Sequence, residues 1–275
     1  MAGVRVLVDG LPSSTVSVFD RGLCYGDGLF ETIRFIDGMA PLWSRHSQRL
    51  AESCARLRLP APDAALLLDE ALMVTAGLDH AVARITVTRG MGERGYAPPA
   101  TPQVTRVVAG FDAPAMAGDA YTDGIHVRWC ETRLALQPLL AGMKHLNRLE
   151  QVMARAEWSD AAVAEGLLCD IDGGVISATM ANLFAVIDGT LVTPALDHCG
   201  VAGVARGEVL ATRPEAKVVR IRPDELIRAT EVFLTSSVRG ILPVQAVGNT
   251  VYVPGPVTRT LQRHWRGLGF PMEQA

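Results

Sequence analysis

The sequence predicts an α+β fold arranged in two domains. Strand and helix patterns follow one another irregularly along the 275 residues, without the β–α–β rhythm of a doubly wound parallel sheet. Hydrophobic residues make up 49% of the chain and charged residues 20%, which is typical of a globular protein. A stretch rich in small residues, 110–124, separates the two halves. We therefore expect a small N-terminal domain over residues 1–115 and a larger C-terminal domain over 122–275.

The N-terminal half is predicted to contain a hairpin, further strands and two helices. Asp9-Gly10 is a dipeptide typical of a tight hairpin turn, and Asp37-Gly38 is a second one. Helical spacing begins at Ser44, a candidate N-cap, and ends before Pro60. The other elements expected here are a helix over 62–76 and strands over 4–8, 33–36, 83–88 and 104–108.

The C-terminal half is predicted to be richer in short strands. Asp172-Gly173 and Asp188-Gly189 are turn dipeptides, and Asp224 is a candidate cap for one turn of helix. A helix is expected to begin near Gly203, after a glycine-rich turn. The remaining elements expected here are strands over 125–130, 166–170, 183–187, 218–221 and 232–235, and helices over 147–159 and 257–267.

Composition and charge exclude several classes of protein. The formal net charge is −3 and the isoelectric point about 6.1, which argues against binding nucleic acid or a membrane surface through bulk charge. No apolar run reaches the roughly 18 residues of a membrane span, and the N-terminal residues alternate like a strand, unlike a signal peptide. The five cysteines are widely spaced and the six histidines are not clustered. We therefore expect a cytoplasmic protein with no metal site.

Lysine is rare in this chain. Of the 26 basic residues only two are lysines, Lys144 and Lys217, and arginine does not lose its proton to become a nucleophilic amine. Lys217 lies in the alternating segment 216–222, which predicts a half-exposed strand with a solvated lysine. Lys144 lies in the apolar segment 139–149, where loss of solvent favours a neutral, nucleophilic amine. From its surroundings alone, Lys144 is either catalytic or an amine that reaches solvent along an apolar surface.

Two glycine-rich segments have compositions that core packing does not explain. Residues 20–34 place glycines among charged and aromatic residues, which suits a loop that approaches another group closely. Residues 200–206 form a glycine-rich turn before a predicted helix. Unpaired backbone N–H groups at such a helix start can bind a phosphate, or the turn can be an ordinary helix cap.

Together with residues 89–96, 140–152 and 181–184, these segments resemble the fold-type IV pyridoxal-phosphate enzymes. This family includes the branched-chain and D-amino-acid aminotransferases and the aminodeoxychorismate lyases. Segments 20–28, 89–96 and 140–152 look most like those of the lyases. The resemblance extends from Val4 to the last predicted helix. It implies a two-domain fold like that of D-amino-acid aminotransferase, pyridoxal 5′-phosphate as the cofactor, and a homodimer.

The resemblance implies a set of cofactor-binding residues. Lys144 falls at the position of the lysine that binds the cofactor as a Schiff base. Arg49 matches the arginine that grips the cofactor phosphate, for which a planar guanidinium is well suited. Gly203 and Val204 match the backbone amides at the phosphate, and Ser237 matches a hydroxyl that completes the phosphate site.

The same resemblance implies residues near the cofactor ring and the substrate. Asn182 falls at an asparagine beside the cofactor, although capping of a turn is an alternative role. Arg94 and Tyr96 match a loop that meets substrate in relatives, and Tyr25 belongs to the first glycine-rich segment. An arginine in that loop suits a substrate with two carboxylates, and a solvated surface arginine is the alternative.

One position departs from the family pattern. Most relatives have a glutamate that keeps the pyridine nitrogen of the cofactor protonated, and this chain has Ser177 at that position. A serine hydroxyl can donate a hydrogen bond but cannot stabilise a pyridinium charge as a carboxylate does. The electron sink is therefore expected to be weaker. Transamination depends on that sink more than loss of pyruvate from an aromatising ring does, so Ser177 favours a lyase.

The resemblance implies an enzyme of folate-precursor synthesis that converts 4-amino-4-deoxychorismate, a small molecule, into 4-aminobenzoate and pyruvate. Lys144 is then also expected to remove the ring proton. The first alternative is a branched-chain or D-amino-acid aminotransferase on the same fold. An alternative of another class is a non-catalytic protein, either one that only binds the cofactor or an arginine-rich interaction module.

Overall fold

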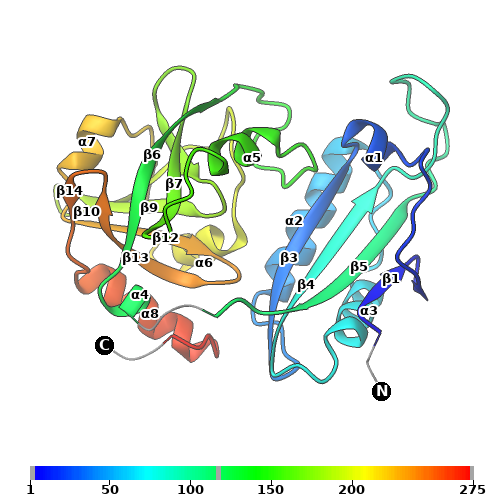
Figure 1. Cartoon of the computed structure of the whole chain (residues 1–275), viewed down its shortest axis with the longest axis horizontal. Helices are drawn as coiled ribbons and strands as arrows, with labels where there is room; N and C mark the ends of the chain where they lie inside the picture. Colours follow the sequence, from blue (N-terminus) through cyan, green and yellow to red (C-terminus); the bar gives the residue numbers. More distant parts are fainter. Residues whose placement is uncertain (1–3, 116–118, 273–275) are drawn as a thin grey trace. The chain divides into compact units, whose positions relative to one another are not determined.

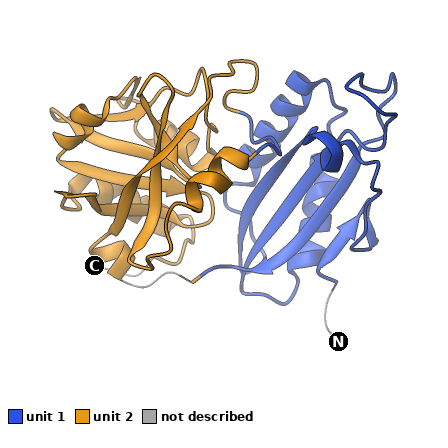
Figure 2. Cartoon of the chain, turned by 45° about the horizontal axis from the view of Figure 1, so that its top comes forward, with its two compact units in different colours: residues 1–114, 143–147 blue, residues 115–142, 148–275 orange. Residues whose placement is uncertain are grey.

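The structure is a computed structural model that describes residues 4–115 and 119–272. The outer ends of the two predicted domains and the middle of the predicted linker lie outside the described residues. The chain forms two compact units (Figure 2). Unit 1 comprises Met1–Pro114 and Met143–Asn147, and unit 2 comprises Ala115–Gly142 and Arg148–Ala275. Helices and strands are mixed in both units, which confirms the predicted α+β class.

Unit 1 contains one antiparallel sheet of five strands in the order β2-β1-β5-β4-β3 (Figure 1). Asp9 and Gly10 both have positive φ angles, 51° and 84°, and form the predicted turn between the first two strands. The strands are β1 (Val6–Val8), β2 (Leu11–Pro12), β3 (Gly28–Ile36), β4 (His80–Thr88) and β5 (Thr105–Asp112). The helices are α1 (Arg21–Tyr25), α2 (Trp43–Leu57) and α3 (Ala64–Thr75).

The two longer helices of unit 1 match the predicted ones, but the predicted cap of α2 is wrong. Ser44 lies inside α2, which begins one residue earlier with Leu42 as its cap and no side-chain capping bond. A cap serine needs extended backbone before the first turn, and Ser44 is already helical. By contrast, α3 is capped by Asp63, whose carboxylate accepts hydrogen bonds from the amides of Ala65 and Leu66.

A short segment from the second half of the sequence completes unit 1. Residues 143–147 run along β3, the last strand in the sheet order. The amide of Phe30 donates to the carbonyl of Lys144 at 2.9 Å, and the amide of Leu146 donates to the carbonyl of Gly28 at 3.0 Å. The outer edge of β3 is therefore hydrogen-bonded to this segment, and the segment carries Lys144.

Unit 2 contains one mixed sheet of nine strands in the order β11-β10-β9-β12-β13-β6-β7-β8, with β14 paired to β13 (Figure 1). The pairs β10/β11, β13/β6 and β6/β7 are parallel. The strands are β6 (Ile125–Leu134), β7 (Val163–Asp170), β8 (Val175–Ala178), β9 (Asn182–Ile187), β10 (Thr190–Pro194), β11 (Lys217–Val219), β12 (Glu231–Ser236), β13 (Gly240–Val247) and β14 (Thr250–Val251). The helices are α4 (Asp119–Thr122), α5 (Leu149–Arg155), α6 (Val204–Thr212), α7 (Pro223–Ile227) and α8 (Pro256–Gly267).

Several predicted boundaries in this part of the chain differ from the structure. The predicted linker contains regular structure, because β5 continues to Asp112 and α4 occupies four of its later residues. Helix α5 is shorter than the predicted helix and ends at Arg155. Asp224 lies inside α7, whose cap is Arg222. Strands β8, β10, β13 and β14 and helix α4 are additional to the predicted elements.

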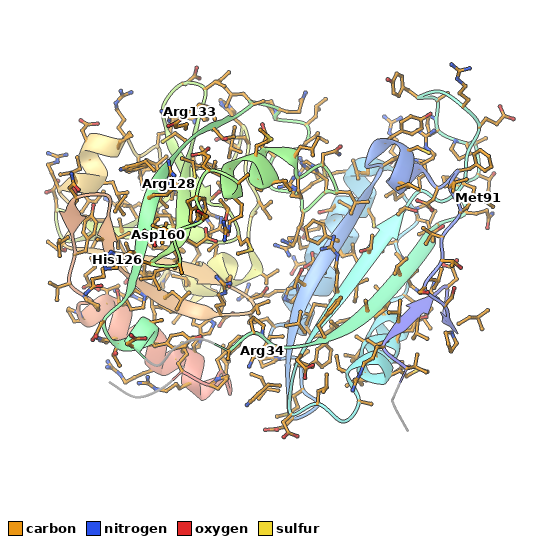
Figure 3. The ribbon with its side chains drawn as sticks, viewed as in Figure 1. Arg34, Met91, His126, Arg128, Arg133 and Asp160 are labelled. Atoms are coloured by element: carbon orange, nitrogen blue, oxygen red, sulfur yellow. The ribbon has the colours of Figure 1, made fainter. Side chains whose placement is uncertain are left out.

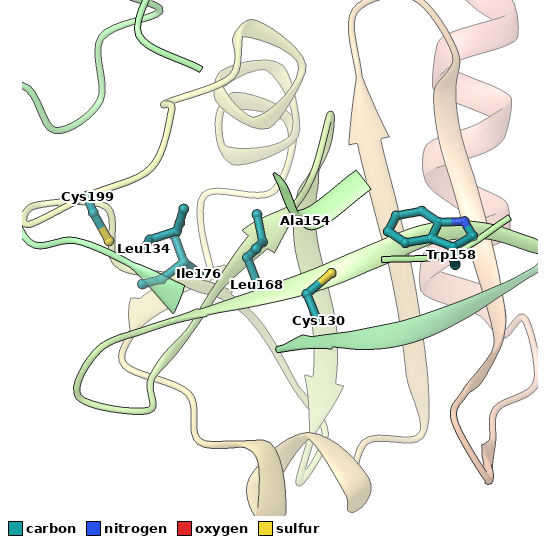
Figure 4. Packing of buried hydrophobic residues seen from close by; sticks show 7 residues of the cluster. All are labelled: Cys130, Leu134, Ala154, Trp158, Leu168, Ile176 and Cys199. Atoms are coloured by element: carbon teal, nitrogen blue, oxygen red, sulfur yellow. The ribbon is translucent and has the colours of Figure 1, made fainter. Parts of the chain in front are cut away.

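A buried hydrophobic cluster fixes the strands of unit 2 that carry candidate site residues (Figure 4). It joins β6, β7, β8 and α5, and Ile176 contributes from β8. The neighbouring residue on β8 is Ser177. The cluster consists of Cys130, Leu134, Ala154, Trp158, Leu168, Ile176 and Cys199. Close packing of this cluster holds β8 in one register against β7, with Ser177 opposite Leu168.

No helix within residues 4–115 and 119–272 is long and apolar enough to cross a membrane. In the same part of the chain, no group of three or more metal-ligating side chains is placed to hold a metal ion. All five cysteines are free, and only Cys24 is exposed.

Candidate active site

Lys144 is held at the edge of the unit 1 sheet, beside an aromatic ring. Its Nζ lies 4.4 Å from the centre of the Phe30 ring, and the Arg84 guanidinium carbon lies 4.4 Å from the same ring. An aromatic face attracts a nearby cation, so the Phe30 ring stabilises an ammonium group at Lys144. The other lysine, Lys217, is exposed on β11, which confirms its predicted solvated position.

Arg49 is held by a buried carboxylate that the sequence analysis did not single out. The Nε of Arg49 donates to Oε1 of Glu31 at 2.8 Å, and Nη2 donates to Oε2 of the same carboxylate. His46, one turn earlier on α2, lies with its Nδ1 2.6 Å from Oε2 of Glu31. Glu31 is 2% exposed on β3, so two residues of the helix hold one buried anion of the strand.

The protonation states in this cluster follow from burial and charge. Burial raises the pKa of Glu31, but the charge of Arg49 and the hydrogen bonds from His46 and Arg49 outweigh it and lower the pKa to about 2. Burial lowers the pKa of His46 below its usual range, although the hydrogen bond to Glu31 acts in the opposite direction. At neutral pH a neutral His46 therefore donates a hydrogen bond from its Nδ1–H to the ionised Glu31 carboxylate. The Nε2 of His46 is buried and has no hydrogen-bond partner among the described residues.

In unit 2, Asn182 fastens the turn that precedes α6. Its Oδ1 accepts from the amide of Gly203 at 3.0 Å, and its Nδ2 donates to the carbonyl of Val201 at 2.9 Å. A Cβ atom at Gly203 would lie 2.1 Å from Asn182 Oδ1, so glycine is required there. Because the Gly203 amide is engaged, the first helix amides without an intrahelical acceptor are those of Val204 and Ala205.

Hydroxyl groups lie close to this turn. Thr235 on β12 is opposite Asn182 in the strand register, and its Oγ1 is buried without a hydrogen-bond partner among the described residues. Ser237 follows two residues later, directly after the last residue of β12. A buried hydroxyl that lacks a partner beside unpaired helix amides suits an anion with several oxygen atoms.

Ser177 is on β8 of the same unit and is 9% exposed. Its side chain makes no hydrogen bond to any other described residue, and its neighbours on the strand are buried apolar residues. Strand β8 contains no carboxylate. Its hydroxyl is therefore left for a ligand or for water.

The predicted substrate loop is organised by the first glycine-rich segment of unit 1. The Arg21 guanidinium donates to the carbonyls of Gly95 and Tyr96 at 3.0 and 3.1 Å. The Tyr25 hydroxyl accepts from the Gly95 amide at 3.0 Å, and its ring lies 5.5 Å from the Tyr96 ring. Met91 lies on the same loop and is exposed (Figure 3).

The structure thus brings Tyr25 and Tyr96 together, whereas Arg94 between them in sequence is an exposed side chain. Arg21 itself is buried and pairs with Asp27, which also pairs with Arg89. The sequence predicted a functional role for this segment, but the role of Arg21 in holding the loop is known only from the structure. The sequence shows only an arginine in a glycine-rich segment, and its burial, which requires several acceptors, is known from the structure.

The chain is similar to known proteins along most of its length. The family model for amino-transferase class IV matches residues 28–247. An aminodeoxychorismate lyase of Vibrio harveyi is 38% identical over 263 residues, which cover 93% of this chain and 97% of that protein. A putative branched-chain-amino-acid aminotransferase of Methanocaldococcus jannaschii is 30% identical over 264 residues, which cover 92% of this chain and 91% of that protein.

Among solved structures, a 4-amino-4-deoxychorismate lyase from Pseudomonas aeruginosa has the same fold, with a TM-score of 0.91. It is 48% identical in sequence, and the match covers 95% of this chain and 98% of that one. The family model spans well over half of the chain, and the relatives match nearly all of it. The chain therefore belongs to the class IV aminotransferase family.

Proposed function

We propose that this protein is an aminodeoxychorismate lyase, which converts 4-amino-4-deoxychorismate into 4-aminobenzoate and pyruvate. The observation that carries the proposal is the placement of Lys144, a rare amine held against an aromatic ring in the same unit as Arg49. The similarity to two lyases over nearly their whole length supports a lyase over an aminotransferase.

Class IV enzymes work with pyridoxal 5′-phosphate, and the residues of this chain fit that cofactor. Lys144 supplies the amine for covalent attachment, and Arg49 supplies a cation for the phosphate. The buried, unpartnered Thr235 hydroxyl beside Asn182 supports a phosphate site at the start of α6. The phosphate donors we propose there are Ser237 and the amides of Val204 and Ala205, whereas the amide of Gly203 is engaged by Asn182. When bound, the cofactor withdraws electrons from the carbon atoms next to the substrate amine.

The residues of the chain then divide the work of the reaction. Lys144 takes the proton from the substrate ring at its Nζ, and the Phe30 ring stabilises the ammonium group that results. Tyr25, Arg94 and Tyr96 are proposed to bind the substrate. The guanidinium group of Arg94 matches a carboxylate of the substrate in charge.

Ser177 supports the choice of a lyase. A hydroxyl at the pyridine nitrogen donates a hydrogen bond to the neutral ring but leaves a protonated ring without a counter-charge. Loss of pyruvate yields an aromatic product, so it needs less help from the cofactor than transamination needs. The hydroxyl makes no hydrogen bond to another described residue, as this role requires.

We further propose a homodimer that works in the cytoplasm. Helix α5 exposes Leu149, Val152 and Met153 at helical spacing, and Leu139 is exposed in the segment before it. A second copy of the chain would cover this apolar face. The free cysteines fit a reducing compartment. Light scattering of the purified protein tests the dimer, and a monomer at micromolar concentration would contradict it.

The test of the lyase is an analysis of products. The purified protein is incubated with 4-amino-4-deoxychorismate, and 4-aminobenzoate and pyruvate are measured. We expect the two products in equal amounts. In a parallel incubation, amino donors are supplied with 2-oxoglutarate. Glutamate formation without any 4-aminobenzoate would identify an aminotransferase instead, the alternative that the Methanocaldococcus relative favours.

The non-catalytic alternatives are less well supported. Five arginines are paired with carboxylates inside the units, so these five are not available to a basic surface for a partner. The pairs are Arg21–Asp27, Arg89–Asp27, Arg49–Glu31, Arg106–Glu70 and Arg128–Glu157. A protein that only binds the cofactor has no need of the substrate loop that Arg21 holds in place.

A further inference from the structure

We propose that Glu31 is a positioning residue that, together with His46, fixes the guanidinium of Arg49 in the orientation that binds the cofactor phosphate. This inference rests on the proposed function, because it takes Arg49 as a phosphate ligand. Glu31 itself does not touch the cofactor in this proposal. It acts through Arg49.

The geometry of the pair fixes the plane of the Arg49 guanidinium. The two bonds to Glu31 use the Nε and Nη2 edge of the guanidinium. A guanidinium is rigid and planar, so fixing one edge also fixes the direction of the N–H groups on the Nη1 side. An arginine without such a partner has several rotatable bonds to order when it binds a phosphate. Glu31 therefore orders the side chain before the ligand arrives.

The strand and the helix around Glu31 both hold this carboxylate in place. It lies on β3 next to Phe30, whose amide is hydrogen-bonded to the carbonyl of Lys144. His46 and Arg49 lie three residues apart on α2, so they present their side chains on one face of the helix to the same carboxylate. The strand that carries the anchor is thus also the strand that pairs with the lysine segment.

The charges that face this cluster are consistent with a fixed ion pair. Glu31 meets Arg49 and His46 from α2, and the amine of Lys144 also acts on His46. A neutral His46 donates a hydrogen bond without adding charge, so Arg49 and Glu31 form a balanced pair in the absence of the phosphate. Glutamine at position 31 keeps the shape of the side chain but cannot accept from both nitrogen atoms of the guanidinium edge.

A second pair in the same unit provides a matched control. Arg106 on β5 donates through Nε and Nη2 to the two carboxylate oxygens of Glu70 on α3, at 2.7 Å each. Glu70 is as deeply buried as Glu31. Its pair has the same bidentate geometry but has no part in the proposed cofactor site. Glu70→Gln therefore measures the general cost of breaking a buried bidentate pair in this unit.

The experiment compares two ligands that differ only in the phosphate. The full-length protein is stripped of cofactor and titrated with pyridoxal 5′-phosphate and with pyridoxal, and binding is followed by absorbance. For Glu31→Gln we expect affinity for pyridoxal 5′-phosphate to fall by about tenfold or more, with affinity for pyridoxal unchanged. For Glu70→Gln we expect the ratio of the two affinities to equal that of the unaltered protein. In an Arg49→Ala background, Glu31→Gln should change the ratio no further.

A purely structural role would give a different result. If Glu31→Gln weakens both ligands equally, or leaves both unchanged, the positioning role is wrong. Should that variant fail to fold, Glu31→Asp keeps the charge but moves it back by one methylene group. A folded Glu31→Asp protein with an unaltered ratio would overturn the proposal as well. The proposed function fails separately, if the unaltered protein does not bind pyridoxal 5′-phosphate or forms no 4-aminobenzoate from 4-amino-4-deoxychorismate.

Discussion

At the scale of single residues, we propose that Lys144 carries the chemistry. We expect Lys144→Arg to abolish turnover and to leave the fold intact, since a guanidinium keeps the positive charge but does not become a nucleophilic amine. Product formation and the melting temperature test this together. Lys217→Arg is the control, because Lys217 is exposed on β11, and full activity is expected for it. Residual turnover in Lys144→Arg, or its loss in the control, would refute the assignment.

Glu31 gives the protein a defined dependence on acid. The pKa of Glu31 falls from 4.5 to about 2 on folding. A carboxylate with a lowered folded-state pKa contributes stability that is complete above the unfolded value of 4.5 and is lost as the pH falls toward 2. The contribution is about 3 kcal/mol at neutral pH. Urea unfolding between pH 6 and pH 3 should show a shallower loss of stability for Glu31→Gln than for the unaltered protein. Parallel curves would contradict the assigned pKa.

The sequence and the structure differ most clearly in how they identify site residues. Lys144 and Arg49 lie in recognisable motifs, so their candidate roles follow from the sequence. Glu31 and Thr235 lie inside strands, where a polar residue also fits a solvated face. Only the structure shows that both are buried. A carboxylate in the mostly apolar run 28–36 was the available signal, since a buried anion needs a partner.

At the scale of elements, the turn before α6 depends on one side chain. We expect Asn182→Ala to destabilise the protein by roughly 1–3 kcal/mol, because the Gly203 amide and the Val201 carbonyl lose their partner. Affinity for pyridoxal 5′-phosphate should fall with it, since the amides proposed to bind the phosphate follow directly in α6. Melting temperatures and cofactor titration test both effects.

Glycine substitutions separate this local effect from a general one. Gly203→Ala should have a similar effect, since a Cβ there would lie 2.1 Å from Asn182 Oδ1. Gly267→Ala at the end of α8 is the control, because a Cβ at that position meets no atom within 4 Å. Equal cofactor affinity in the two glycine variants would show that the turn does not shape the phosphate site.

Element boundaries show what local sequence patterns determine. The hairpin at Asp9-Gly10 was predictable, because only residues that tolerate positive φ fit such a turn. The start of α2 was not, since a serine inside a helix and a serine at its cap have the same local sequence. Strand β8 is four residues long, and its register depends on packing against β7 rather than on its own pattern.

At the scale of the whole molecule, one short segment belongs to a unit from which it is distant in sequence. Segment 143–147 belongs to unit 1 although unit 2 precedes and follows it. Its pairing with β3 joins residues more than a hundred positions apart. Periodicity and turn dipeptides are local signals and do not report such a contact. The family resemblance supplied the candidate role of Lys144, and the structure supplied its surroundings.

The type of reaction is also a property of the whole site. We expect Ser177→Glu to raise slow transamination of simple amino acids and to leave lyase activity unchanged or reduced, because a carboxylate stabilises the protonated pyridine ring. Rates of pyruvate and glutamate formation are measured together with the melting temperature. A stable variant with an unaltered ratio of the two rates would show that position 177 does not tune the reaction.

The most direct test of the central claim is the location of the cofactor on the chain. The purified protein, loaded with pyridoxal 5′-phosphate, is reduced with borohydride, digested and examined by mass spectrometry. With only two lysines in the sequence, the result is unambiguous. We predict a phosphopyridoxyl group on the peptide that contains Lys144 and none on the peptide that contains Lys217. Modification of Lys217, or of neither peptide, would contradict the claim that Lys144 makes this chain a pyridoxal-phosphate enzyme.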